Sequence, residues 1–216
     1  LATTANNCVV IGRDAGEALT TGIKNVAIGA SALSTEDTGN WNTAVGFEAL
    51  KDLNYDGNGQ NVAVGSYAAA NLTTSTDNVA VGHLSLASAT TQANKNIAIG
   101  TQSMGGSWTS ADHDGSVAIG YQAMYGALTT GSSGSIGIGY TALTALTSGA
   151  DNIAIGFQAG ASITTGAGNT IVGFQAGMDA DTSTVNAEYN TYLGWNAGRY
   201  LDDGEHNVAV GAGAMK

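Results

Sequence analysis

Short clusters of apolar residues, each closed by a glycine, recur along the whole chain at a nearly constant spacing. The recurring unit is Asn-x-Ala-(Val/Ile)-Gly-x-x-Ala-(Leu/Met), with clear copies beginning at Asn25, Asn42, Asn96 and Asn152. Its glycine occurs twelve times, 17 to 21 residues apart and most often 17. A period of this length predicts a solenoid in which each copy forms one coil. The twelve repeat glycines are Gly12, Gly29, Gly46, Gly65, Gly82, Gly100, Gly120, Gly139, Gly156, Gly173, Gly194 and Gly211.

Two apolar positions in each copy, separated by one residue, predict a short strand. The residue before the glycine is Ile, Val or Leu, and the residue two positions earlier is Val, Ile or Thr. Because side chains two apart share one face of a strand, we expect this pair to point into the core. The residue between them is alanine in eight copies and would then face outward. An apolar residue on an outward face suggests that the face is covered, most simply by a second copy of the chain.

The remaining columns of the repeat favour a second strand in each coil. Alanine or serine stands three residues after every repeat glycine. A weaker apolar column follows seven residues after the glycine, and Glu36 and Ser107 interrupt it. We therefore expect two short strands per coil, a tight turn at the glycine, and a variable loop that absorbs the length differences. A helical interpretation of the period is disfavoured by the β-branched pairs and the regular glycines. The weaker column contains Leu19, Leu53, Leu72, Leu146, Ile163 and Leu201.

Asparagine opens the unit in nine copies, with Ser116 and Ser135 in two others and Cys8 in the first. Stacked asparagine side chains can hydrogen-bond to one another along a stack of parallel strands. The column is therefore interpreted as a structural ladder rather than as a binding site.

Composition and charge narrow the possible partners. The chain has 32 glycines, no proline and a formal net charge of −11. Absence of proline suits a backbone committed to hydrogen-bond ladders. With six Lys and Arg residues and no basic run, neither nucleic acid nor an anionic membrane is an expected partner. One cysteine excludes an internal disulfide, and no apolar run is long enough to suggest membrane insertion. Without an initiator Met or signal peptide, the chain is expected to be part of a longer fibre.

The segments NVAIG at Asn25 and SVAIG at Ser116 resemble the head repeat of trimeric autotransporter adhesins. The version NTAVGFEAL at Asn42 is similar to repeats of bacteriophage tail and virion fibres. The adhesin repeat is shorter than these coils. The resemblance implies an all-β fold, a left-handed parallel β-roll of about twelve coils, forming a single domain over residues 1–216 and a homotrimer. It also implies an extracellular location, on a virion fibre or a bacterial cell surface.

No constellation in the sequence indicates an enzyme, a cofactor or a metal site. The segment GIGYTA at Gly137 imitates a dinucleotide-binding fingerprint, but it is one copy of the repeat. His83, His113 and His206 occupy different columns and are expected to be solvated loop residues. Two acidic loops contain residue types that bind calcium but lack the rest of a calcium loop, and two carboxylate pairs have the residue types used in glycan hydrolysis but are only adjacent in sequence. These are Asp112–Asp114–Gly115, Asp56–Asn58–Gly59, Asp202–Asp203 and Glu36–Asp37.

The column directly after the repeat glycine is aromatic in five consecutive copies. In a solenoid these residues would form one stripe, with Gln122, Gln158 and Gln175 forming a polar ladder beside it. An exposed stripe could bind sugar faces or a protein receptor, whereas a buried one would be a seam within the roll or between subunits. We name Tyr121, Tyr140, Phe157, Phe174 and Trp195 the aromatic ladder.

Three functions compete at this point. The first is a trimeric phage tail fibre segment that contacts a host receptor or glycan, and the second is a bacterial adhesin that binds host or matrix. The third is an ice- or carbohydrate-binding solenoid, suggested by threonine pairs that lack the flat strand array such a surface needs. These pairs are Thr20–Thr21, Thr73–Thr74, Thr90–Thr91 and Thr164–Thr165.

Overall fold

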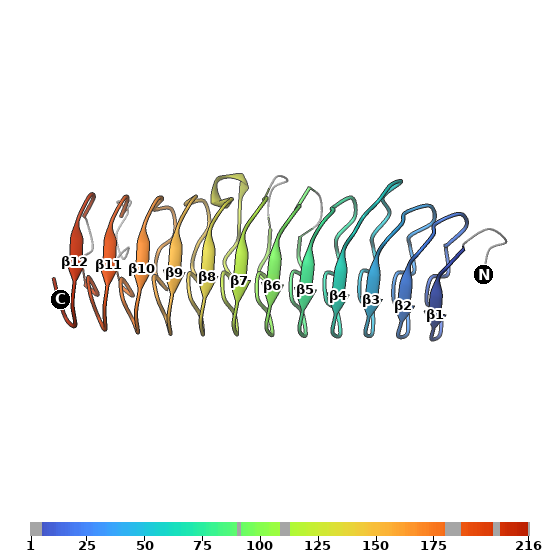
Figure 1. Ribbon diagram of the computed structural model, residues 1–216, viewed down its shortest axis with the longest axis horizontal. Helices are drawn as coiled ribbons and strands as arrows, with labels where there is room; N and C mark the ends of the chain where they lie inside the picture. Colours follow the sequence, from blue (N-terminus) through green and yellow to red (C-terminus); the bar gives the residue numbers. More distant parts are fainter. Residues whose placement is uncertain (1–5, 90–91, 109–112, 180–186, 201–203, 216) are drawn as a thin grey trace. The chain divides into compact units, whose positions relative to one another are not determined.

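The computed structural model describes residues 6–89, 92–108, 113–179, 187–200 and 204–215 (Figure 1). Within these ranges the chain contains twelve strands of three residues, one per repeat, and one 3-10 turn, η1 at Thr130–Ser132, but no α-helix. The strands are β1 Val9–Ile11, β2 Val26–Ile28, β3 Thr43–Val45, β4 Val62–Val64, β5 Val79–Val81, β6 Ile97–Ile99, β7 Val117–Ile119, β8 Ile136–Ile138, β9 Ile153–Ile155, β10 Thr170–Val172, β11 Thr191–Leu193 and β12 Val208–Val210.

The chain divides into two compact units. Unit 1, Leu1–Gly105, contains β1 to β6, and unit 2, Gly106–Lys216, contains β7 to β12. Within each unit, neighbouring strands are parallel and follow the order of the sequence, one coil apart (Figure 1). Equivalent residues pair with one another, as Ala27 pairs with Ala44 and Ile138 with Ile155. The expected all-β parallel solenoid of about twelve coils is therefore confirmed.

The strand faces are the reverse of the expected ones. Ala27, Ala44 and the other residues at the central position of β2 to β12 are fully buried, whereas the flanking Val and Ile side chains are partly exposed. The expectation that the larger side chains point inward was wrong because the interior is narrow. In half of the coils a leucine or methionine from the opposite wall, such as Leu50 or Met124, fills it and leaves room for alanine beneath the strand.

The opposite wall is not the predicted second strand. Each coil has one strand, and the segment after the glycine turn places alternate residues in the left-handed region. Glu48 (φ 54°) donates its backbone N–H to the preceding coil at Ala30, and Leu50 (φ 49°) donates to the following coil at Ala68. The two left-handed residues thus donate to opposite neighbouring coils, while Ala49 between them donates to Gly46 in its own coil. Side chains at the second of these positions, such as Leu50 and Met124, are fully buried.

Side-chain volumes in the core compensate one another between the two walls. Where the central strand residue is large, as at Ile171 and Tyr192, the leucine position is glycine. A Cβ on Gly198 would lie 2.6 Å from Cδ1 of Tyr192, and one on Gly177 would lie 3.1 Å from Cδ1 of Ile171. Conversely, Gly137 replaces alanine where Met124 packs, since an added Cβ would lie 2.9 Å from Cγ of Met124. At these positions of unit 2, large and small residues are thus matched.

The repeat glycines are required for two reasons. Gly29, for example, has φ +134°, a region that L side chains rarely adopt. A Cβ there would also collide with the carbonyl oxygen of Gly46 in the next coil. Close stacking of the turns and the backbone conformation therefore both exclude a side chain, as the column of glycines suggested.

The asparagine column forms the predicted ladder. Asn152 Oδ1 accepts the backbone N–H of Asn169 at 3.0 Å, and Asn152 Nδ2 donates to the carbonyl of Gly166 at 2.8 Å. Each amide therefore links its own coil to the next one. These hydrogen bonds replace the ones that the side chain would make with water if it were exposed. Ser135 continues the ladder through its Oγ, which accepts the N–H of Asn152. Cys8 does so with sulfur, accepting the N–H of Asn25 at 3.4 Å.

Candidate interaction surfaces

The outward strand residues form an apolar surface along each unit, which we name the outer face. It consists of the first and third residues of every strand, almost all Val or Ile, with Thr43, Thr170, Thr191 and Leu193 as departures. Although β-branched, these side chains are not buried: Val64, Ile99 and Ile155 are each exposed by more than a third. Continuous apolar strips of this kind mark interaction surfaces rather than solvated surfaces. The sequence pattern suggested a covered apolar face but assigned it to the alanines.

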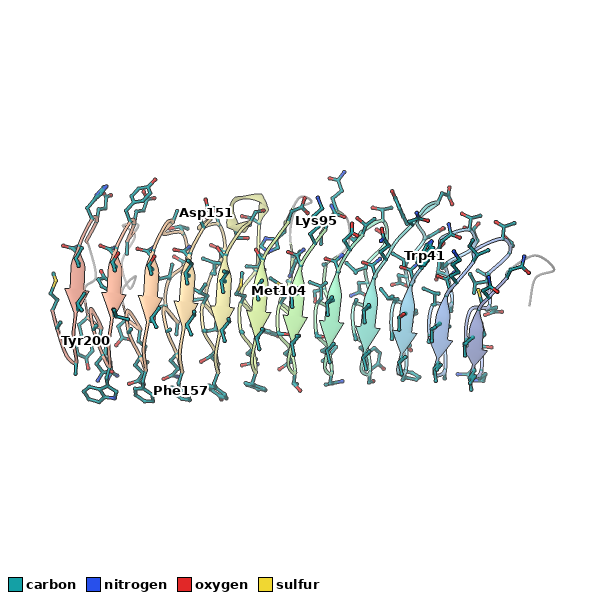
Figure 2. All side chains as sticks on the ribbon, in the orientation of Figure 1. Trp41, Lys95, Met104, Asp151, Phe157 and Tyr200 are labelled. Carbon is teal, nitrogen blue, oxygen red and sulfur yellow. The ribbon has the colours of Figure 1, made fainter. Side chains whose placement is uncertain are left out.

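The aromatic ladder is exposed and regular. Tyr121, Tyr140, Phe157 and Phe174 stack with ring centroids 5.1 to 5.2 Å apart and interplanar angles of 9 to 17°. Trp195 continues the stack 6.4 Å beyond Phe174. The five rings are 41 to 54% exposed. Figure 2 shows Phe157 at the turn edge of unit 2, projecting away from the coil. A buried seam within the roll is therefore excluded for this column.

The ladder borders the outer face because a single glycine separates the two columns. Ile155 ends β9, Gly156 makes the turn, and Phe157 follows. On its other side lie Gln158 and Gln175, which are joined by a side-chain hydrogen bond of 2.7 Å. This contact confirms part of the expected glutamine ladder. The aromatic rings thus lie between an apolar and an uncharged polar column.

Unit 1 has a different surface at the same turn. Its column reads Arg13, Ala30, Phe47, Ser66, His83 and Thr101. Phe47 contacts Tyr67 edge-on, with centroids 5.2 Å apart and planes at 79°. No parallel stack of rings forms at this turn among the described residues of unit 1. The aromatic ladder therefore belongs to unit 2.

The three histidines do not share a site, and one of them differs from expectation. His83 and His206 are exposed, as predicted, but His113 is buried, so the prediction of a solvated residue was wrong there. Its ring contacts Trp108 edge-on with centroids 4.7 Å apart, and its Nδ1 lies 2.9 Å from Oγ of Ser132. The Trp108 ring and the Ser132 side chain thus enclose the imidazole of His113. Burial lowers the pKa of His113 to about 4, against the smaller opposing effect of Asp114.

Acidification is expected to destabilise unit 2 through His113. The folded pKa of about 4 lies below the unfolded value near 6.5, so the unfolded chain binds the proton more readily. The free energy of unfolding should fall as the pH drops from about 6.5 to about 4, by up to about 3 kcal/mol. Urea unfolding across this range should show a shallower pH slope for His113→Gln than for the wild type. The exposed-site variant His206→Gln should keep the wild-type slope, and equal slopes in all three proteins would contradict the assignment.

Among the carboxylates considered for catalysis or calcium, Glu36 has a structural role and three others lie outside the described residues. Glu36 is buried, and its carboxylate accepts backbone N–H groups of Gly39 at 2.6 Å and Tyr55 at 3.1 Å. Burial raises the pKa of Glu36 and these hydrogen bonds oppose the rise. Glu36, which interrupts the apolar column, therefore organises a loop. Asp112, Asp202 and Asp203 lie outside the described residues. Within the described ranges, no cluster of three His, Cys, Asp or Glu side chains is suited to hold a metal.

Thr20, from one of the threonine pairs, uses its hydroxyl group within the stack. Thr20 Oγ1 donates to the carbonyl of Asp37 at 3.1 Å, and Thr147, which belongs to no pair, donates its hydroxyl to the backbone carbonyl of Thr164 at 2.8 Å. Thr90–Thr91 falls outside the described residues. A hydroxyl group that binds the next coil is not arranged for an ice surface, so the geometry of Thr20 gives the ice-binding interpretation no support. None of the described segments is a helix with the length and apolarity needed to cross a membrane.

Comparison with protein-family models, curated proteins and solved structures finds no match to this chain. The solenoid and its two exposed surfaces are therefore the basis for the functional argument.

Proposed function

We propose that this chain is a structural and adhesive segment of a homotrimeric fibre, with the coils winding as a left-handed roll. The biological setting proposed is a phage tail fibre involved in host attachment. The observation that carries the proposal is the outer face, whose Val and Ile columns run along both units while the interior is already filled. Burying such columns against other copies would remove a large apolar area from water, at roughly 25 cal/mol per Å².

A bacterial surface adhesin has the same physical requirements, because it also needs an elongated, self-associating roll. The two settings differ in what accompanies the repeats. A membrane-anchor domain encoded after them would favour the adhesin, and neighbouring virion genes would favour the tail fibre.

Sedimentation equilibrium of the intact chain tests the self-association. We expect a mass three times that of the chain, and dissociation of the assembly when Ile138→Lys and Ile155→Lys are combined on the outer face. Each lysine would place a charge in an apolar contact, which costs several kcal/mol when unpaired. The matched control is Thr165→Lys, in an exposed loop outside the outer face, which should remain trimeric. A monomeric wild type would contradict the proposal, as would equal behaviour of the two variants.

A further inference from the structure

We infer that the aromatic ladder is a binding surface for a neutral linear polysaccharide, which lies along the direction of coil stacking with successive sugars over successive rings. The inference deepens the proposed attachment role and rests on it for its biological setting. Its physical argument comes from the spacing of the rings, the polarity of their neighbours and the contrast between the two units.

The spacing of the ladder suits an extended sugar chain. One ring is presented per coil, and coils are separated by the distance between adjacent parallel strands, close to about 4.8 Å. The first four ring centroids are accordingly 5.1 to 5.2 Å apart. A pyranose in an extended, equatorially linked polysaccharide advances by a similar length. A chain laid along the ladder can therefore keep register with the rings over several sugars.

The rings also leave surface for contact. Aromatic rings prefer an offset stack over a face-to-face sandwich, and an offset stack with centroids 5.1 to 5.2 Å apart leaves part of each ring face uncovered. Tyr140 is 47% exposed and Phe174 is 43% exposed, so each ring keeps accessible surface within the stack. Such a surface offers an apolar, electron-rich area to the C–H face of a pyranose at every coil.

Uncharged hydrogen-bonding groups lie directly beside the rings. Gln122, Gln158 and Gln175 occupy the next column and are each partly exposed. Apolar surface combined with a few placed polar groups is the usual composition of a small-molecule or sugar site. Amide groups can both donate to and accept from sugar hydroxyls. The net charge of −11 disfavours an anionic polysaccharide, which leaves a neutral one.

The contrast with unit 1 argues against a second copy of this chain as the occupant. Both units carry the same outer face, so both have the same surface for self-association. At the turn, however, unit 1 has Ala30, Ser66 and Thr101 where unit 2 has rings. Self-association along the outer face therefore does not require aromatic side chains at this position. Phe47 is a single ring in this column of unit 1, whereas the continuous parallel stack is an addition confined to unit 2, as expected for contact with a separate partner.

Affinity electrophoresis and calorimetry of the full chain test the inference. The probes are hydroxyethylcellulose, glycol chitin and galactomannan in the gels, and cello- and chito-oligosaccharides of two to six sugars in the calorimeter. We expect retardation by at least one polymer. We also expect affinity for the matching oligosaccharides to rise with length up to about five sugars, because the ladder has five rings.

Matched variants identify the surface. Tyr140→Ala, Phe157→Ala and Phe174→Ala combined should weaken binding at least about tenfold, since three stacking surfaces are lost. Phe47→Ala with Tyr67→Ala, in unit 1, should leave affinity unchanged. No binding to any of the probes, equal losses in both variants, or dissociation of the assembly by the ladder variant would overturn the inference. A monomer with ladder-dependent binding would instead refute the proposed trimer and keep this site, whereas a trimer without binding would refute this site alone.

Discussion

Replacing Gly156 by alanine is expected to lower the free energy of unfolding by more than about 4 kcal/mol, among the largest effects of any single substitution in this chain. Gly156 has φ +141°, which costs an L residue about 1 to 3 kcal/mol. The new Cβ would also press on the carbonyl oxygen of Gly173 in the next coil. Both glycines donate their backbone N–H groups across the stack, Gly156 to Ile138 and Gly173 to Ile155, so neither can move without breaking the ladder. Urea unfolding followed by circular dichroism measures the loss.

The last repeat glycine provides a matched control that separates the two effects. Gly211 occupies the same column with φ +119°, but a Cβ there would meet no described atom within 4 Å. Gly211→Ala should therefore show the conformational cost alone, about 1 to 3 kcal/mol. If Gly156→Ala and Gly211→Ala destabilised the chain equally, close stacking of the turns would not be a reason for the regular recurrence of these glycines.

Tyr192→Ala is expected to destabilise unit 2 by about 3 to 5 kcal/mol, and a second substitution should recover part of that loss. The Tyr192 ring is fully buried and occupies the space left by Gly198, whose added Cβ would lie 2.6 Å from the ring. Gly198→Leu alone should therefore be overpacked and unstable. Combined with Tyr192→Ala, however, Gly198→Leu would restore the alanine–leucine pair found in other coils, as at Ala27 and Leu33.

The measurement is a double-mutant cycle of unfolding free energies. We expect the double variant to be at least about 2 kcal/mol more stable than the sum of the single losses predicts. The backbone itself should not prevent the exchange, because Gly198 has φ +61° and Leu143 occupies the equivalent position with φ +51°. Additive losses would show that the two walls of the coil do not share one packed volume.

The repeat in the sequence was sufficient to predict the solenoid, the glycine turns and the asparagine ladder. In each case a single residue type carries its own physical reason: glycine for a positive φ, asparagine for a bridging amide. The strand faces could not be predicted correctly because Val-Ala-Ile alternates in size rather than in polarity. Which side faces inward depends on the volume supplied by Leu50, Met124 and their equivalents from the opposite wall.

The second strand was mispredicted for a related reason. Its alanine and leucine residues alternate as in a strand, but Leu50, Leu143 and Met124 have φ near +50°. Such a conformation costs a non-glycine residue about 1 to 2 kcal/mol and is not expected from local preference. Hydrogen bonds to both neighbouring coils stabilise it, and this tertiary effect has no local sequence signal. Glycine at the equivalent positions 16, 160, 177 and 198 was the available clue.

For the candidate surfaces, the sequence predicted which residues form the ladder but not whether they are exposed. Exposure depends on the glycine turn, which directs Phe157 and its equivalents away from the coil. His113 shows the converse case, a polar residue in a loop that becomes buried because Trp108 and Ser132 surround it. Neither outcome follows from the column in which the residue stands.

The one-to-one pairing of equivalent residues in adjacent coils has a mechanical consequence. Within each unit, every coil is held by its two neighbours through short hydrogen-bonded ladders and a thin alanine-rich interior. A tensile load applied to one end of a unit would therefore act on the terminal coil first and detach it before loading the next. Each detached coil of 17 residues would release up to about 60 Å of extended chain. A segment of this design would dissipate force in small successive steps rather than rupture at once.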